Sequence, residues 1–317
     1  MFKFNHYIVD SNHLQNILGE FDKNLKALIY YFSCNIVVTS KEVHVDSQDD
    51  KLIKKIEDVF NCLYLISLQK ISIRERDTIY VASIIDNVSV SDIVDFYKNR
   101  KEIVKNINGK SLYPKTFSQV EYIKNLNKND VVLSYGPAGV GKTYLAVCDA
   151  VKKFKSGVYS KIILSRPIVE AGESLGFLPG EIKEKVDPYL TPLYDSLYEL
   201  LGRKAVDEYI ENGLIEIAPL AYMRGRTLEN AYIILDEAQN TTKKQMKLFL
   251  TRLGFNAKMV ITGDLTQIDL MNAKDSGLKF AIERLSGIPG IKIMEFTKND
   301  VVRNPLVQRI IERFEDD

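Results

Sequence analysis

The second half of the chain alternates short, continuous apolar runs with segments of helical period, and this alternation constrains the fold most. The helical periods include 142–154, 243–253 and 278–285. Apolar strands separated by helices are typical of a parallel sheet that helices cover on both faces. We therefore predict an α/β fold for this part. Its expected strands are 131–134, 162–164, 215–218, 232–235, 259–261 and 291–294.

The segment between the first of these strands and the following helix has the pattern of a phosphate-binding loop. Its residues fit GxxxxGK[ST], and its glycines permit the left-handed angles that let successive N–H groups point at one phosphate. Lys142 is predicted to bridge the β- and γ-phosphates of ATP, and the Thr143 hydroxyl to bind Mg²⁺. An ordinary glycine-rich turn is the alternative. The residues are Gly136, Pro137, Ala138, Gly139, Val140, Gly141, Lys142 and Thr143.

Two acids, Asp236 and Glu237, follow the apolar strand 232–235. Ligands of parallel sheets gather where the carboxyl ends of strands meet, so we predict that Asp236 holds Mg²⁺. Glu237 is predicted to act as the general base that activates water. The alternative is that both acids only cap the helix that begins at Thr241 or Thr242.

Three further polar residues are candidates for the same site. The amide of Gln267 can donate and accept simultaneously, which suits a sensor of the γ-phosphate. Gln119, upstream of the loop, is a candidate partner of the adenine edge, and Arg303 is a candidate arginine finger. Each has a plainer alternative: a turn residue for Gln267, a surface amide for Gln119 and a solvated side chain for Arg303.

Residues 1–70 predict a small, separate α+β domain. Strands, with 7–9 as the first, and helices follow the order β-α-α-β-β-α of a type I KH domain, in which a GxxG turn admits nucleotide phosphates. Here Glu20 and Asp22 in that turn would repel phosphate, so docking to a protein or to the rest of the chain is an equal alternative. Residues 71–115 are expected to form a helical segment, with Ser91 or Asp92 as a cap, and a basic linker.

Composition excludes some classes of protein. Lys and Arg number 43 against 42 for Asp and Glu, so the net charge of +1 creates no long-range field toward nucleic acid or lipid, and a polyanion site must be local. The apolar runs are too short for a membrane span. The cysteines, Cys34, Cys62 and Cys148, are odd in number and widely spaced. We expect a reduced, cytoplasmic protein without a soft-ligand metal site.

Longer motifs around these residues resemble the PhoH-like ATPases of the YbeZ type. The resemblance covers nearly the whole chain and implies a P-loop, RecA-like ATPase core with a parallel sheet over 116–317, preceded by the KH-like domain. It also implies that Gln119, Gln267 and Arg303 correspond to the helicase Q-motif glutamine, motif III glutamine and motif VI arginine. The motifs are GPAGVGKTYLAV, SRPIVEAGESLGFLPGEIKEKVDPYLTPLYD, YMRGRTLENAYIILDEAQN, ITGDLTQID and DVVRNPLV.

The resemblance further implies an RNA-stimulated, helicase-like ATPase in ribosomal RNA maturation, with ATP and Mg²⁺ as cofactors. The implied partners are ribosomal RNA, a YbeY-type endoribonuclease and further copies of the chain in a ring-like homo-oligomer such as a hexamer, where Arg303 acts in cis or across subunits. Arg166, Arg224 and Arg226 are carried over as candidate RNA or subunit contacts. The alternatives are a nucleotide-switched scaffold that recruits the nuclease and a phosphotransferase that acts on a small molecule.

Overall fold

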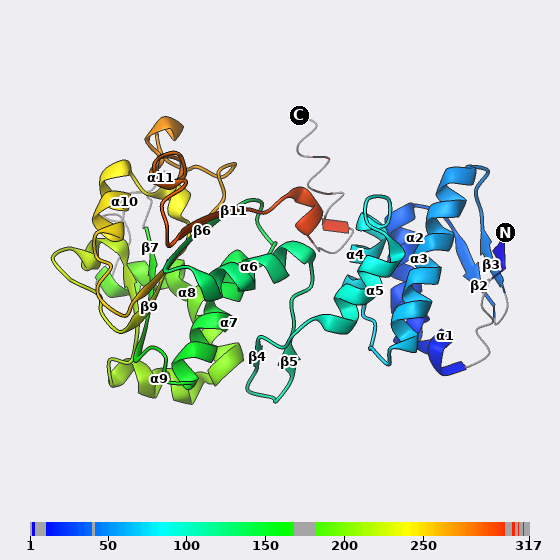
Figure 1. Cartoon of the computed structure of the whole chain (residues 1–317), viewed down its shortest axis with the longest axis horizontal. Helices are drawn as coiled ribbons and strands as arrows, with labels where there is room; N and C mark the ends of the chain where they lie inside the picture. The colour runs from blue at the N-terminus through cyan, green and yellow to red at the C-terminus, as the bar shows by residue number, and fades with distance from the viewer. Residues whose placement is uncertain are drawn as a thin grey trace. The chain divides into compact units, whose positions relative to one another are not determined.

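A computed structural model of the chain describes residues 2–3, 11–39, 42–167, 182–301, 306–307, 310 and 313. The chain divides into two compact units: Met1–Arg100 with Val301–Asp317, and Lys101–Asp300 (Figure 1). None of the described helices combines the length and the apolarity that crossing a bilayer requires.

The N-terminal unit packs helices on a small antiparallel sheet with the strand order β1-β3-β2. Its elements follow the predicted order β-α-α-β-β-α, although the strand expected at 7–9 lies outside the described residues. Asp49 begins the third helix as its N-cap, because its carboxylate accepts from two backbone N–H groups. The elements are β1 (Phe2–Lys3), α1 (Ser11–Leu18), α2 (Lys23–Phe32), β2 (Ile36–Val38), β3 (Glu42–Val45) and α3 (Asp50–Leu68).

The helical pattern predicted over 71–97 resolves into two helices, α4 (Glu75–Ile84) and α5 (Val90–Asn99). The cap of α5 is Ser89, whose hydroxyl accepts from the backbone N–H of Asp92, so the predicted caps at Ser91 and Asp92 are wrong. The basic segment expected to be a linker contains the end of α5 and a short hairpin that belongs to the second unit. Its strands are β4 (Val104–Lys105) and β5 (Ser111–Leu112).

The second unit contains the predicted parallel sheet, with the strand order β11-β6-β10-β9-β7-β8. Every pairing in it is parallel, and each predicted apolar run forms one strand. The carboxyl ends of these strands therefore meet at one edge, which we call the carboxyl edge. The strands are β6 (Val131–Tyr135), β7 (Lys161–Arg166), β8 (Ile215–Pro219), β9 (Ala231–Leu235), β10 (Lys258–Gly263) and β11 (Ile291–Glu295).

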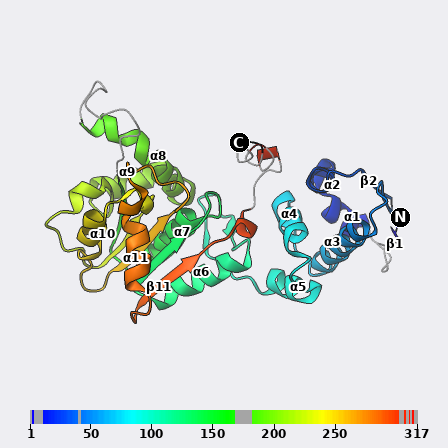
Figure 2. The ribbon, with the colours of Figure 1, turned by 90° about the horizontal axis from the view of Figure 1, so that it is seen from above.

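Helices cover both faces of this sheet, as Figures 1 and 2 show. Along β9, Ile233 and Leu235 pack with α10 and α11 in one core cluster, whereas Tyr232 points to the other face and bonds to α7. Every residue of β9 is buried, as expected of a central parallel strand. The helices are α6 (Phe117–Lys128), α7 (Lys142–Lys155), α8 (Ile182–Leu201), α9 (Arg203–Glu211), α10 (Lys243–Leu250) and α11 (Gly277–Leu285).

Candidate functional site

The phosphate loop begins where neighbouring strands hold the backbone of Gly136 closely. The N–H of Gly136 donates to the carbonyl of Gly263 (3.2 Å), and the carbonyl of Tyr135 accepts from the N–H of Phe296 (2.7 Å). Gly136 has a φ of 141°, and a Cβ built there would lie 2.2 Å from the carbonyl oxygen of Phe296. Only glycine fits this position, so the loop is anchored to β10 and to the segment after β11.

Lys142 lies at the start of α7 and is almost fully buried. Its Nζ donates to the carbonyls of Gly136 (2.7 Å) and Pro137 (2.8 Å), which belong to the phosphate loop itself. The ammonium group is thus held over the loop at the N-terminus of a helix. The positive charge of the side chain and the partial positive charge of the helix N-terminus both favour an anion there.

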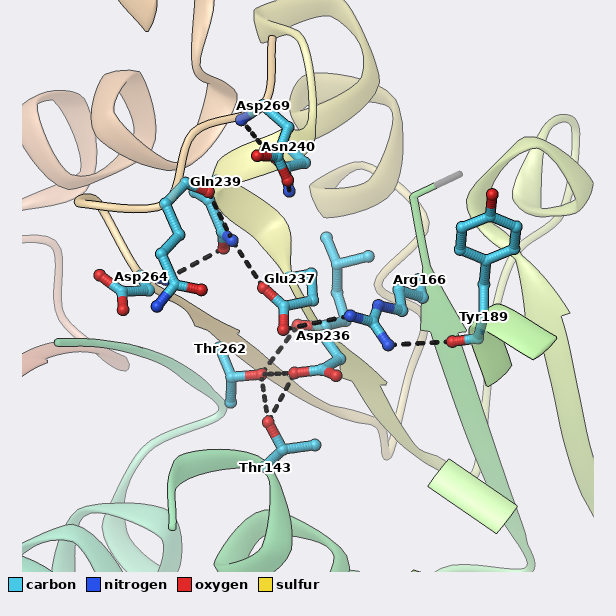
Figure 3. Close-up of polar contacts among 12 residues, drawn as sticks. Thr143, Arg166, Tyr189, Asp236, Glu237, Gln239, Asn240, Thr262, Asp264 and Asp269 are labelled. Carbon is cyan, nitrogen blue, oxygen red and sulfur yellow. Dashed lines mark hydrogen bonds and ion pairs between the residues drawn. The ribbon is translucent and has the colours of Figure 1, made fainter. Parts of the chain in front are cut away.

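Three oxygen-bearing side chains meet beside the loop at the carboxyl edge (Figure 3). The Thr143 hydroxyl donates to Asp236 Oδ1 (2.5 Å), the Thr262 hydroxyl donates to the same oxygen (2.8 Å), and the two hydroxyl oxygens are 3.1 Å apart. Such hard oxygen ligands fit Mg²⁺, which usually takes one or two protein oxygens together with substrate phosphates. The structure thus brings together the two predicted metal ligands, Thr143 and Asp236, and adds Thr262.

Glu237 is held in place from two sides, as Figure 3 shows. Its Oε1 lies 3.2 Å from Arg166 Nη2, and its Oε2 accepts from Gln239 Nε2 (2.5 Å). Arg166 Nη1 in turn donates to the carbonyl of Tyr189 (2.9 Å). The backbone of Glu237 is left-handed (φ 51°, ψ 39°), an uncommon conformation for this residue type that is typical of functional positions.

The capping alternative for the two acids is wrong. Helix α10 begins at its own cap, Thr242, whose hydroxyl accepts from the N–H of Gln245, while the Gln245 side chain accepts from the N–H of Thr242. This capping box satisfies the first turn without a carboxylate. Asp236 and Glu237 are therefore available for another role.

Gln239, which the sequence analysis did not single out, connects Glu237 to the loop after β10. It is buried, and its Oε1 accepts from the N–H of Asp264 (3.0 Å). Its Nε2 donates to the carbonyl of Gln267 (3.1 Å) as well as to Glu237. The Gln267 side chain itself is exposed, so its link to Glu237 runs through its backbone and Gln239. The only signal in the sequence was an amide residue four positions after the end of a buried strand.

Asn240 repeats this bridge one residue further on. Its Nδ2 donates to Asp269 Oδ2 (3.1 Å), and its Oδ1 accepts from the N–H of Asp269 (2.8 Å). The segment after β9 and the segment after β10 are therefore joined by two successive amide side chains. A displacement of one segment would be passed to the other.

The carboxyl edge also retains unused hydrogen-bonding capacity. Among the described residues, two buried side-chain oxygens have no hydrogen-bond partner: Ser165 Oγ on β7 and Asp264 Oδ2 after β10. Buried polar atoms are normally paired, because an unpaired one costs about 1–3 kcal/mol. Unpaired atoms at the carboxyl edge of the sheet fit a site that a ligand completes.

Gln119 lies against the phosphate loop. Its Oε1 accepts from the N–H of Lys115 (2.7 Å), and its Nε2 donates to the carbonyl of Val140 (3.0 Å). It is buried, so the surface-amide alternative is wrong. Because each amide atom has a second bonding position, pairing with adenine stays a prediction.

The other predicted arginines have different outcomes. Arg303 lies outside the described residues. Both terminal nitrogens of the Arg226 guanidinium donate to the Glu216 carboxylate (2.5 and 2.6 Å). This hydrogen bonding raises the pKa of Arg226, and the guanidinium is already engaged within the chain. Arg224 is exposed, and Arg166 contacts Glu237 as described above.

The chain is similar to known proteins over most of its length. The PhoH-like protein family matches residues 111–315. A PhoH-like protein of Bacillus subtilis (strain 168) is 50% identical over 300 residues, which cover 95% of this chain and 93% of the relative. A PhoH-like protein of Synechocystis sp. is 42% identical over 301 residues, 94% of this chain and 90% of the relative.

Among solved structures, the Sulfolobus solfataricus SWI2/SNF2 ATPase core in complex with dsDNA aligns with a TM-score of 0.34 at 17% identity, covering 57% of this chain and 43% of that one. This likeness is too weak to support an argument. The sequence matches extend through the phosphate loop, both acids and the loop after β10. The chain therefore belongs to the PhoH-like protein family.

Proposed function

We propose that this protein is a Mg²⁺-dependent ATPase. The observation that carries the proposal is the position of Glu237, which is held by Arg166 and Gln239 next to the Thr143–Asp236 pair of the phosphate loop. A phosphate loop alone would support nucleotide binding only. A fixed second carboxylate after the metal-binding acid supports hydrolysis, because the attacking water needs a base and a defined position.

The chain's own residues have distinct roles in this reaction. Backbone N–H groups of 136–143 and Lys142 bind the phosphates, while Thr143 and Asp236 would hold Mg²⁺. When bound, this ion neutralises charge on the β- and γ-phosphate oxygens. Glu237 accepts a proton from water as the water oxygen bonds to the γ-phosphorus. The bond to the β,γ-bridging oxygen breaks, and ADP and phosphate leave. Gln239 and Arg166 fix the direction of the carboxylate.

We also propose that RNA stimulates this ATPase and that its cycle remodels ribosomal RNA in the cytoplasm. The proposal includes an assembly of several copies and a YbeY-type endoribonuclease as partner. Family membership and the exposed Arg224 support an RNA contact. The element order of the N-terminal unit supports a KH-like domain, and the exposed acids of its turn, Glu20 and Asp22, favour docking to protein over docking to phosphate.

Phosphate release from ATP tests this function and its alternatives. It is measured with Mg²⁺ alone, with single-stranded RNA and with hydroxyl-bearing small molecules as acceptors. The ATPase reading predicts release that depends on Mg²⁺ and rises with RNA. Slow release that RNA does not change would favour the nucleotide-switched scaffold. Transfer of phosphate to a small-molecule acceptor would favour the phosphotransferase.

A further inference from the structure

The short turn after β8 exposes an aromatic side chain between two buried anchors. This turn, the 3-10 helix η3 (Leu220–Met223), lies at the carboxyl edge. Leu220 and Met223 are in the core cluster, whereas Tyr222 is 57% exposed. Single exposed apolar residues are common. The structure around Tyr222 indicates that this exposed side chain belongs to a binding surface.

The backbone after Tyr222 is held firmly. The guanidinium of Arg226 is fixed by its two bonds to Glu216. The carbonyl of Arg226 accepts from Arg252 Nη1 (2.9 Å). Because the turn is already ordered, a ligand that binds Tyr222 would cause only a small loss of conformational entropy, which favours binding.

The turn packs on α10, and the exposed charges of these two elements are cationic. The segments 220–228 and 238–252 contain no Asp or Glu, in a chain whose net charge is only +1. Lys243 lies 3.8 Å from Asp275, whereas Lys244 and Lys247 have no ion-pair partner among the described residues. The exposed cations of the two segments are Arg224, Lys243, Lys244 and Lys247.

We propose that this surface, formed by Tyr222, Arg224, Lys244 and Lys247, binds single-stranded RNA. A base stacks on the Tyr222 ring, and the three cations contact backbone phosphates. The proposal rests on the proposed function and assigns its RNA contact to specific residues. A protein interface is the less suitable occupant, because Tyr222 is the only strongly exposed large apolar side chain of the two segments. A duplex would not offer an unstacked base.

Stacking is tested with two fluorescent 12-mers of equal charge, an oligouridylate and an oligomer of abasic ribose phosphates. Anisotropy titrations are made without nucleotide. Tyr222→Ala should weaken oligouridylate binding roughly 5- to 100-fold and abasic binding much less, because one stacked base is lost. Tyr222→Phe should bind like the wild type. Phe255→Ala is the control, since Phe255 is also aromatic and is even more exposed (86%) but precedes β10 at the opposite edge.

The phosphate contacts are tested by the salt dependence of binding. Lys244→Gln combined with Lys247→Gln should reduce the slope of log affinity against log salt by about 1.4, since each phosphate contact on a single strand contributes about 0.7. Lys204→Gln combined with Lys292→Gln, two exposed lysines far from α10 in the sequence, should leave the slope unchanged.

Unchanged oligouridylate affinity in Tyr222→Ala would overturn the proposal. So would a change of oligomeric state in that variant, measured by light scattering, with RNA affinity unaltered, because it would assign the surface to a protein interface. Phosphate release without RNA is measured in parallel. If the wild type released no phosphate, the ATPase function would be rejected. The RNA titrations test RNA binding at the Tyr222 surface independently of that result.

Discussion

The two edges of the parallel sheet both bury polar groups, but they use them differently. At the amino edge, Asp149 accepts from Lys153 (2.7 Å) and from the Tyr232 hydroxyl (2.8 Å), and Lys258 donates to the carbonyl of Asn129. We call Asp149, Lys153, Tyr232 and Lys258 the amino-edge cluster. At the carboxyl edge, Lys142 donates to two carbonyls of its own loop, and Ser165 and Asp264 keep unpaired oxygens.

This difference separates a structural polar cluster from a functional one. In the amino-edge cluster the carboxylate has found a cation and a hydroxyl within the chain, so the cluster needs no ligand. At the carboxyl edge Arg166 pairs with Glu237, but two buried oxygens, Ser165 Oγ and Asp264 Oδ2, have no partner within the described part of the chain. We expect substitutions at the carboxyl edge to change catalysis and binding, and substitutions at the amino edge to change stability.

The largest effect is expected for Glu237→Gln. The amide preserves shape but cannot accept a proton, so turnover should fall roughly 10²- to 10⁴-fold while ATP binding is kept. Steady-state phosphate release gives kcat, and a fluorescent ATP analogue gives affinity. The control is Glu283→Gln, an exposed acid on α11, which should retain full turnover. Near-normal turnover in Glu237→Gln would remove this residue from the mechanism.

Lys142→Ala should weaken ATP binding about 10- to 100-fold, because charge-assisted bonds to phosphate contribute about 1.5–3 kcal/mol. Calorimetric titration with Mg²⁺ and ATP measures this change. Lys153→Ala, which removes the cation that pairs with Asp149 in the amino-edge cluster, provides the contrast. It should lower the free energy of unfolding and leave the ATP affinity of the folded protein unchanged. An equal loss of ATP affinity in both variants would contradict the assignment of nucleotide binding to the carboxyl edge and of stability to the amino edge.

Gln239→Met should lower kcat about 10-fold with little change in KM. Methionine fills a similar volume but removes the bonds to Glu237, to the Asp264 N–H and to the Gln267 carbonyl, so the base loses its fixed direction. Hydrogen exchange should also become faster in 264–269. Gln245→Met, which removes only the capping box of α10, is the control for a general loss of stability. A drop in unfolding free energy with unchanged kcat would make Gln239 purely structural.

The smallest effect is a pH-dependent stability term from Lys258. Burial, with Lys153 nearby, lowers the pKa of Lys258 to about 8, whereas an unfolded lysine keeps its ordinary value of about 10.4. Below pH 8 the charged, buried Lys258 therefore lowers the free energy of unfolding. This destabilisation disappears as the pH rises toward 10, because Lys258 becomes neutral in the folded state first. The wild type should gain about 2 kcal/mol relative to Lys258→Met between pH 7 and 9.5.

Denaturant titrations of both proteins at several pH values measure this difference, since other lysines cancel in the comparison. The turnover of Lys258→Met at pH 7.5 should equal that of the wild type. A stability difference that does not change with pH would mean that Lys258 titrates normally, and reduced turnover would extend the functional region to the amino edge.

Much of the fold followed from local patterns. Each predicted apolar run is a strand of the parallel sheet, and the GxxxxGK[ST] pattern located the loop between β6 and α7. Strands with continuous apolar sequence and loops with obligatory glycines carry their signal within a few residues. The hairpin β4–β5 escaped notice, because its two-residue strands have too short a pattern to detect.

The site was predicted less completely, for a physical reason. Asp236 and Thr143 were identified by motif, but Thr262 and Gln239 matter through contacts across strands that no spacing along the chain reveals. The same holds for Arg166, whose proximity to Glu237 depends on β7 lying beside β9. Sequence patterns find residues with a local signature, and sheet order decides which others join them.

The most direct test is a crystal structure with Mg²⁺ and a non-hydrolysable ATP analogue. We predict that the γ-phosphate lies within hydrogen-bond distance of Lys142 Nζ, that the metal lies between Thr143 and Asp236, and that Glu237 faces the side from which water attacks. A nucleotide bound away from residues 136–143, or a γ-phosphate remote from Glu237, would contradict the proposed ATPase.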